Sequence, residues 1–220
     1  MNTKNCAIAK ILTSQKKILK GKNIANQFWG VRTIKIYLVK VDGDAEEYLF
    51  HRLSKFINDE KKERIQRQKV EQNARNMLVG EILAKVAIKR TFGVAIEKQT
   101  FAYSKFGKPF LLHYPNIHFN TSHSGNYVAC GVSDNPIGVD IQKTVQFKPD
   151  LARRVCNENE LNQIKKSRDK VSEFTKLWTQ KEAILKQSGE GIASGKIKNC
   201  IDNQKLQSMK IEDYWLSVAF

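Results

Sequence analysis

Two short segments of the chain concentrate the side chains that could do chemistry. One is Phe119–Gly125 (FNTSHSG), and residues 136–143 (PIGVDIQK) follow it closely. Because side chains alternate along a strand, Asp140 and Gln142 would share one face and Ile141 would point the other way. A carboxylate beside an amide oxygen suits Mg²⁺, which binds one or two carboxylates together with phosphate oxygens and waters. Asp140 equally fits a strand-end acid that accepts hydrogen bonds from a loop, so the segment alone leaves both interpretations open.

His123 stands between two serines in what the sequence predicts to be a glycine-flanked loop. An imidazole in that position could donate a hydrogen bond to a phosphate group. A single loop histidine is more often merely exposed or hydrogen-bonded, so this residue also has two interpretations.

The second reactive segment is residues 178–186 (WTQKEAILK). Helical spacing places Trp178, Glu182, Leu185 and Lys186 at adjacent positions of one face. A carboxylate among apolar neighbours is either desolvated and functional or paired with the lysine four residues on. The Glu182–Lys186 pair is the ordinary alternative, since such pairs are common on helix surfaces.

The elements that must position these residues predict an α+β protein. Asn58, with two acids behind it, is typical of a helix N-cap, and the helical pattern continues to about Arg90 in one or two pieces. A second long helix is predicted over 172–187, ending before Gly189. Strands are predicted at 33–39, 127–132, 137–141 and 214–220, and a loop with a Gly-Lys-Pro turn at 103–115.

A weak internal repeat links the two predicted helices. Gly80–Lys85 (GEILAK) resembles Lys181–Lys186 (KEAILK), and an apolar strand follows each helix later in the chain. Two similar α+β halves would place a ligand cleft at their junction. The similarity is short and consists of common helix formers, so alone it proves little.

Composition narrows the class of protein. The chain has 220 residues with 38 Lys plus Arg against 22 Asp plus Glu, a formal net charge of +16. No apolar run is long enough to span a membrane, and four widely spaced cysteines indicate neither a disulfide framework nor a zinc site. Six lysines and no acid fall in residues 1–30, which lack a signal-peptide pattern. We therefore expect a cytoplasmic protein that binds a polyanionic small molecule, with nucleic acid as the alternative partner.

Four motifs together carry a family resemblance. GKP at 107–109, FNxSHS at 119–124, PIGVDI at 136–141 and WxxKEAxxK at 178–186 occur in the order and spacing of the Sfp-type 4′-phosphopantetheinyl transferases, which this chain resembles over about residues 33–220. The resemblance implies a monomer with a pseudo-dimeric, two-lobed α+β fold, each lobe a small, mainly antiparallel sheet against a long helix. The implied divisions are a basic N-terminal extension (1–30), a first lobe (31–135) and a second lobe with the metal site (136–220).

The same resemblance implies roles for individual residues. Asp140 and Glu182 match the family's metal ligands, Glu182 is also its proposed general base, and Lys186 matches a lysine near the coenzyme A diphosphate. Gln142 departs from the pattern, because many relatives carry a third acid there, and is only a possible ligand. The residues that match groups holding coenzyme A are Lys61, Arg64, Arg75, Lys108, Ser122 and His123, of which Arg75 matches a contact to the nucleotide 3′-phosphate.

The implied reaction is attack by a serine hydroxyl of an apo carrier protein on coenzyme A, with Mg²⁺ (or Mn²⁺) as cofactor. It transfers the 4′-phosphopantetheine arm and releases adenosine 3′,5′-bisphosphate. An acidic carrier domain suits the positive charge of the chain. Two alternatives remain, a non-catalytic module that binds coenzyme A or a carrier protein, and a basic nucleic-acid-binding protein. The intact Asp140, Glu182 and Lys186 favour the enzyme.

Overall fold

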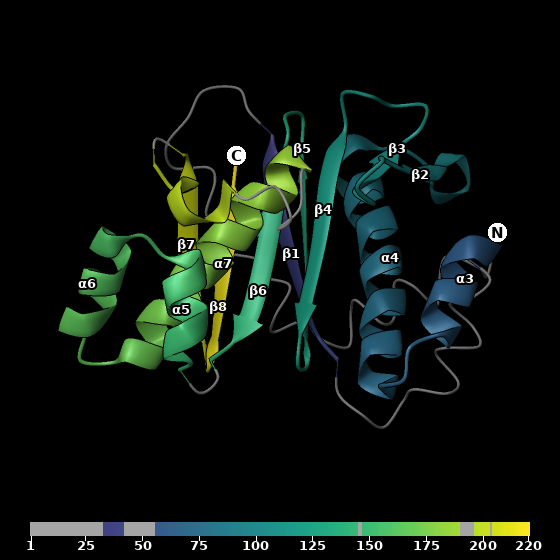
Figure 1. The fold of residues 1–220 in the computed structure, drawn as a ribbon. Coiled ribbons are helices and arrows are strands. Elements are labelled where there is room, and N and C mark those ends of the chain that lie inside the picture. The colour runs from purple at the N-terminus through teal and green to yellow at the C-terminus, as the bar shows by residue number, and fades with distance from the viewer. Residues whose placement is uncertain (1–32, 42–55, 145–146, 190–195, 203) are drawn as a thin grey trace.

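The computed structural model describes residues 33–41, 56–144, 147–189, 196–202 and 204–220. The predicted basic extension, residues 1–30, lies outside these ranges. Two three-stranded antiparallel sheets stand in the centre, and helices flank them on both sides (Figure 1). The strands are β1 (Ile34–Lys40), β2 (Phe101–Tyr103), β3 (Pro109–Leu111), β4 (His118–Ser124), β5 (Tyr127–Ser133), β6 (Gly138–Lys143), β7 (Leu206–Ile211) and β8 (Tyr214–Ala219). The α-helices are α3 (Asp59–Gln66), α4 (Glu71–Phe92), α5 (Pro149–Val155), α6 (Glu158–Lys166) and α7 (Lys170–Ser188).

The two sheets share one topology. The first has the order β1-β5-β4 with α4 between its first two strands in the chain, and the second has the order β6-β8-β7 with α7 in the corresponding place. The predicted α+β class is therefore confirmed. The identical strand order also supports the predicted division into two related lobes, which stays a prediction.

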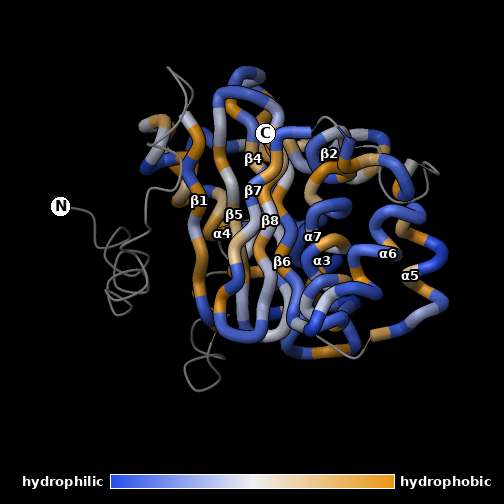
Figure 2. Tube along the Cα trace, turned by 90° about the vertical axis from the view of Figure 1, so that its left-hand side faces the viewer, coloured by the Kyte–Doolittle hydropathy of each residue, from blue (hydrophilic) through white to orange (hydrophobic). Residues whose placement is uncertain are grey.

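Apolar side chains form separate clusters on the two faces of the sheets. One cluster lies between α4 and the first sheet and contains Leu83, Ile88 and Phe119. Another joins the opposite faces of the two sheets and contains Ala129 and Ile141. Figure 2 shows the corresponding apolar positions recurring along the strands. The sheets are thus packed on each other and covered by helices outside.

The predicted N-cap at Asn58 and the predicted helix stop before Gly189 are confirmed, and the N-cap of α7 at Asp169 was not predicted. Asn58 caps α3 by accepting a hydrogen bond from Lys61 N at 2.9 Å, and α4 follows as a separate helix. Asp169 caps α7, which ends at Gly189 in the left-handed conformation with φ 76°. Among the described helices, none is long and apolar enough to cross a membrane.

Two predictions of loops are wrong. The stretch 118–124, which contains His123, is strand β4 and pairs antiparallel with β5 along its whole length. Within the predicted loop 103–115, β3 pairs with β2 around the Gly-Lys-Pro turn. The physical reason is that both segments are short and rich in polar residues or Gly and Pro, so their local pattern lacks the apolar alternation of a strand. Pairing with a neighbouring strand decides their conformation.

Helix α7 lies unusually close to β6 at Gly138. A Cβ on this residue would stand 1.9 Å from Ala183 O and 2.4 Å from Gln187 N, both backbone atoms of α7. Only glycine permits that approach. The glycine two residues before Asp140 therefore lets the helix that carries Glu182 rest against the strand that carries Asp140.

Candidate active site

Strands β4 and β6 lie side by side and run in the same direction, where the two sheets meet (Figure 1). Side chains of β4 take the place of backbone acceptors. Asn120 Oδ1 accepts from Val139 N at 2.8 Å, Ser122 Oγ from Ile141 N at 3.3 Å and Ser124 Oγ from Lys143 N at 3.0 Å. We call these three contacts the β4–β6 ladder. Every second residue of β4 bonds to every second residue of β6, so the ladder fixes the position of Asp140 along β4.

The hydroxyl of Ser122 is fully used in this arrangement. It donates to Asp140 Oδ1 at 2.8 Å and accepts from Ile141 N and from Lys186 Nζ, the latter at 2.9 Å. A hydroxyl can donate one hydrogen bond and accept two, so Ser122 has no donor or acceptor position left. Ser122 thus holds Asp140 and Lys186 together in the described structure.

Asp140 is the centre of the site. Its side chain is buried, and Oδ1 also accepts from Lys186 Nζ at 2.6 Å. Lys186 therefore pairs with Asp140, and the described residues contain no Glu182–Lys186 ion pair of the kind the helix spacing allowed. Asp140 Oδ2 is buried and has no hydrogen-bond partner among the described residues.

Glu182 presents a second free carboxylate oxygen. The residue is buried, and its Oε1 also lacks a partner within the described ranges. Burial and the nearby negative charge of Asp140 raise the pKa of Glu182 to about 6, against the opposing effect of Lys186. Two buried carboxylates with unpartnered oxygens are a suitable donor set for a divalent cation.

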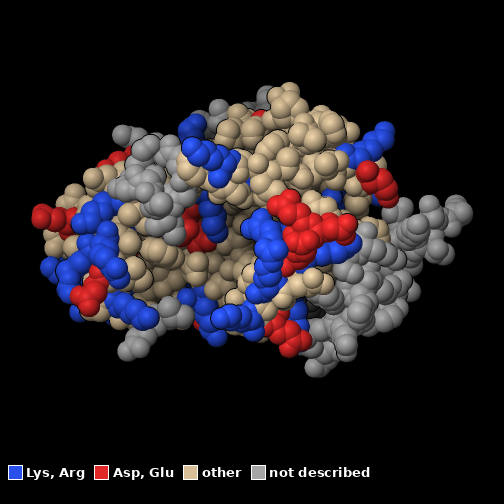
Figure 3. Space-filling model, turned by 45° about the vertical axis from the view of Figure 1, so that its right-hand side comes forward, with Lys and Arg blue, Asp and Glu red and all other residues tan. Residues whose placement is uncertain are grey.

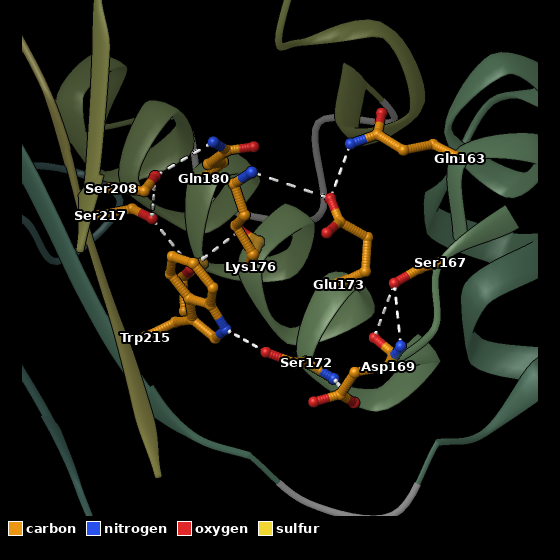
Figure 4. A network of polar contacts seen from close by, with 11 residues as sticks. Gln163, Ser167, Asp169, Ser172, Glu173, Lys176, Gln180, Ser208, Trp215 and Ser217 are labelled. Carbon is orange, nitrogen blue, oxygen red and sulfur yellow. Dashed lines mark hydrogen bonds and ion pairs between the residues drawn. The ribbon is translucent and has the colours of Figure 1, made fainter. Parts of the chain in front are cut away.

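Polar contacts fix α7 on the second sheet and so place Glu182 and Lys186. Thr179 Oγ1 bonds to Ser217 Oγ at 2.9 Å, and Ser217 is the cross-strand neighbour of Asp140. Trp215 Nε1 donates to Ser172 Oγ at 2.9 Å near the start of the helix. Figure 4 shows the contact between Trp215 and Ser172 and the contact between Ser208 and Ser217. Gln142 lies opposite Trp215, on the same face of β6 as Asp140, as the strand alternation predicted.

Lys181, next to Glu182, has a structural role that the sequence analysis missed. It is fully buried, pairs with Glu160 Oε1 at 2.8 Å and donates to Ile197 O at 2.8 Å. The pair joins α7 to α6 and to the segment before β7. No local pattern connects residues 160 and 181, although a lysine in an otherwise apolar helix face was a signal for a buried partner.

A cleft of about 240 Å³ opens beside these groups. Lysines and arginines lie around a hollow near the middle of the face in Figure 3. Lys108, from the Gly-Lys-Pro turn, donates to Gln187 O at 2.7 Å and Ile137 O at 3.3 Å, and burial lowers its pKa to about 8. The residues lining the cleft include Lys108, Asn120, Thr121, Glu182, Lys186 and Gly189.

The remaining predicted binding residues lie on the first-sheet side. His123 is half-buried, and burial together with the charges of Lys186 and Lys61 lowers its pKa, against the opposing effect of Asp140. Lys61 Nζ is 3.8 Å from Glu81 Oε2, and Arg64 stacks over the ring of Tyr103. The charges of Asp140 and Lys186 therefore act on the pKa of His123.

Arg75 lies near the start of α4 and pairs with Glu71 Oε1 at 2.6 Å. No described contact joins Arg75 to the Asp140–Lys186 pair. Sequence reasoning also missed Asn120 and Ser124 as positioning groups, although polar residues at every second position of 120–124 were a usable signal.

Comparison with known proteins gives the family. Residues 44–135 match the model for the 4′-phosphopantetheinyl transferase N-terminal region, and residues 136–213 match that for the 4′-phosphopantetheinyl transferase superfamily. The chain is 32% identical over 162 residues to 4′-phosphopantetheinyl transferase Sfp of Bacillus subtilis (strain 168), which covers 73% of this chain and 72% of that protein. The chain belongs to the 4′-phosphopantetheinyl transferase family.

Two further relatives are also named 4′-phosphopantetheinyl transferases. The chain is 32% identical over 161 residues to 4′-phosphopantetheinyl transferase gsp of Aneurinibacillus migulanus, covering 72% of this chain and 67% of that one. It is 30% identical over 167 residues to 4′-phosphopantetheinyl transferase psf-1 of Bacillus pumilus, covering 75% and 72%. The resemblance found in the four sequence motifs is confirmed.

Proposed function

We propose that the protein transfers the 4′-phosphopantetheine arm of coenzyme A to a serine hydroxyl of an apo carrier protein. Family membership supports the reaction. The observation that carries it on this chain is the meeting of Asp140, Glu182 and Lys186 beside a cleft, with two buried carboxylate oxygens left without partners among the described residues. Buried polar groups are normally hydrogen-bonded, so two unpartnered carboxylate oxygens beside one cleft favour a bound ligand.

The donor set supports Mg²⁺ as the cofactor. Asp140 Oδ2 and Glu182 Oε1 would hold the ion, and Gln142 could add an amide oxygen or hold a coordinated water. Within the described ranges no group of three or more His, Cys, Asp and Glu residues could hold a metal, so phosphate oxygens and waters would complete the shell. When bound, Mg²⁺ would neutralise the diphosphate and orient its two phosphates.

Two side chains then act on the reacting groups, and a third holds them in place. Glu182 takes the proton of the carrier serine as general base. Lys186 stabilises the leaving phosphate as its charge develops. Ser122, whose hydroxyl is already used, keeps Asp140 and Lys186 in place and supplies no further donor in this arrangement.

The first-sheet side supplies binding energy for the nucleotide end of coenzyme A. Lys61, Arg64, Arg75 and His123 are the residues that we assign to it, and Lys108 joins them from the Gly-Lys-Pro turn. These groups are cationic or hydrogen-bond donors, which suits phosphate oxygens. Because they are assigned to phosphates that do not react, they would act through affinity for coenzyme A.

We propose an acidic carrier domain as the second substrate, because the formal charge of +16 favours association with an anionic partner. We also propose that the protein acts as a cytoplasmic monomer without a nucleic-acid or membrane partner. No run of five or six basic residues occurs in the chain, which supports this choice over nucleic acid.

A direct assay tests the proposal. Purified protein is incubated with coenzyme A, Mg²⁺ and a panel of apo carrier proteins, and each carrier is weighed by mass spectrometry. We expect one carrier or more to gain a single phosphopantetheine arm, and we expect chelation of the metal to abolish the gain. Binding of coenzyme A without any mass gain would favour the non-catalytic module instead.

A further inference from the structure

A row of polar side chains crosses the second sheet on the face that α7 covers. Asp140 on β6, Ser217 on β8 and Ser208 on β7 are cross-strand neighbours, so their side chains share one face of the sheet. Helix α7 contacts this row twice. Lys186 pairs with Asp140, and Thr179 bonds to Ser217 at 2.9 Å. The row therefore joins the proposed metal ligand to a chain of hydroxyl groups.

The direction of each hydrogen bond in this chain follows from one carbonyl group. Thr179 Oγ1 donates its single proton to Lys176 O at 2.8 Å, because a carbonyl can only accept. In the contact between Thr179 and Ser217, the proton must therefore come from Ser217. Ser217 has no second proton, so Ser208 donates to it at 2.9 Å and itself accepts from Gln180 Nε2 at 3.0 Å. Figure 4 shows Gln180, Ser208 and Ser217 along this chain.

Asp140 receives no proton from this chain. Its Oδ1 already accepts from Ser122 and from Lys186, while its Oδ2 has no partner among the described residues. Ser217 is the neighbour of Asp140 on β8 and is fully buried, but its proton is used in the bond to Thr179. Asp140 Oδ2 is therefore left without a donor although a hydroxyl group lies on the adjacent strand.

We propose that Thr179 is a positioning residue for the metal site: by accepting the proton of Ser217, it keeps Asp140 Oδ2 open for a divalent cation. The inference rests on the proposed function, in which this oxygen is a ligand. A buried hydroxyl that loses its acceptor turns to another, and Oδ2 is an unpartnered acceptor on the neighbouring strand within the described ranges. A hydrogen bond to Oδ2 would reduce the negative charge that the carboxylate offers to the cation, so binding would weaken.

Binding of Mn²⁺ to the whole chain in the presence of coenzyme A, without carrier protein, tests the proposal. Free Mn²⁺ is measured by electron paramagnetic resonance, and the Mn²⁺ bound by coenzyme A alone is subtracted. Thr179→Val keeps the branched shape of the side chain but frees the proton of Ser217. We expect this variant to raise the Kd for Mn²⁺ about tenfold, as a competing hydrogen bond to a charged group would. Thr179→Ser keeps the hydroxyl and should bind Mn²⁺ like the wild type.

A second substitution separates this role from simple packing. Ser217→Ala removes the proton itself, so we expect a Kd near the wild-type value for this variant and also for the double variant with Thr179→Val. Loss of packing between α7 and the sheet would instead weaken binding in both single variants and further in the double variant. That pattern, or an unchanged Kd in Thr179→Val, would overturn the proposal. If the wild-type protein adds no Mn²⁺ binding to that of coenzyme A, the metal site of the proposed function is wrong as well.

A neutron structure of the wild-type protein provides a measurement that does not depend on how well Thr179→Val folds. We expect the hydroxyl deuteron of Ser217 to lie between the side-chain oxygens of Ser217 and Thr179. A deuteron of Ser217 directed at Asp140 would show that the chain runs in the opposite direction, and the proposal would be wrong.

Discussion

The helices α4 and α7 carry the same pair of residues at the same spacing, with different results. In α4, Glu81 is 3.8 Å from Lys61, and Lys85 donates to Gln99 O at 3.0 Å from a position over the ring of Phe101. In α7, Lys186 reaches Asp140 on β6, and Glu182 keeps one oxygen without a partner among the described residues. Both residues of the α4 pair have partners beside their own helix. In the α7 pair, Glu182 keeps an unpartnered oxygen next to the cleft.

The difference comes from the strands and not from the helices. The strand β1, which corresponds to β6 in the order of its sheet, reads IKIYLVK and has no acid. Helix α4 also packs mainly on β5 and β4 and only weakly on β1, whereas α7 packs closely on β6. The strand β6 reads GVDIQK, and its acid faces α7. The Glu–Lys pair of a helix therefore forms a candidate active site only in α7. There β6 supplies the carboxylate of Asp140, and β4 supplies the hydroxyl of Ser122. Four predictions separate the roles of the two halves.

The largest effect is expected where α7 meets β6. Gly138→Ala would drive a Cβ into the backbone of Ala183, so we expect loss of the folded protein or a large fall in Tm. The matched change Gly80→Ala, within α4, meets nothing closer than Val128 Cγ1 at 3.7 Å and should stabilise the helix by about 0.5–1 kcal/mol. Thermal unfolding of both variants is the measurement, and similar Tm values for the two would contradict this account of the helix contact.

The second effect separates the two glutamates. Glu182→Gln removes the proposed base and a metal ligand and should lower kcat by at least about 100-fold. Glu81→Gln should leave kcat close to wild type, because Glu81 faces Lys61 rather than Asp140. Steady-state kinetics with coenzyme A and a carrier protein compare them. Near-wild-type kcat in Glu182→Gln would remove Glu182 from the reacting groups.

The third effect tests whether the first half acts through affinity. Arg75→Ala should raise KM for coenzyme A about tenfold with little change in kcat, since the lost contact is to a charged group away from the reaction. Dephospho-coenzyme A lacks the 3′-phosphate, so the variant and the wild type should differ little with it. An equal loss with both coenzymes would show that Arg75 does not contact that phosphate.

The smallest effect concerns the missing third acid on β6. Gln142→Glu adds a negative charge on the face of Asp140 and should lower the half-saturating Mg²⁺ concentration severalfold without a large change in kcat. Lys143→Gln, at the next and exposed residue, changes the charge by the same −1 and is the matched control for a general charge effect. If both variants respond alike, Gln142 is not a ligand.

The α+β class, both long helices, four of the strands and the family could be predicted from the sequence. The elements depend on signals within a few residues, such as the N-cap of α3 at Asn58 and the helix stop at Gly189. The family could be predicted because four motifs, each weak alone, occur in one order and spacing. Local periodicity and residue type are enough for such predictions.

The packing of distant elements, rather than any local pattern, brings the groups of the site together. The segment 118–124 looked like a loop because its inward positions, Asn120, Ser122 and Ser124, are polar, and their partners are backbone N–H groups of β6, nineteen residues later in each case. Lys186 pairs with Asp140, 46 residues away, instead of with Glu182 on its own helix. Contacts between distant segments depend on how whole elements pack, and the burial that leaves Asp140 Oδ2 and Glu182 Oε1 unpartnered arises only when β4, β6 and α7 come together.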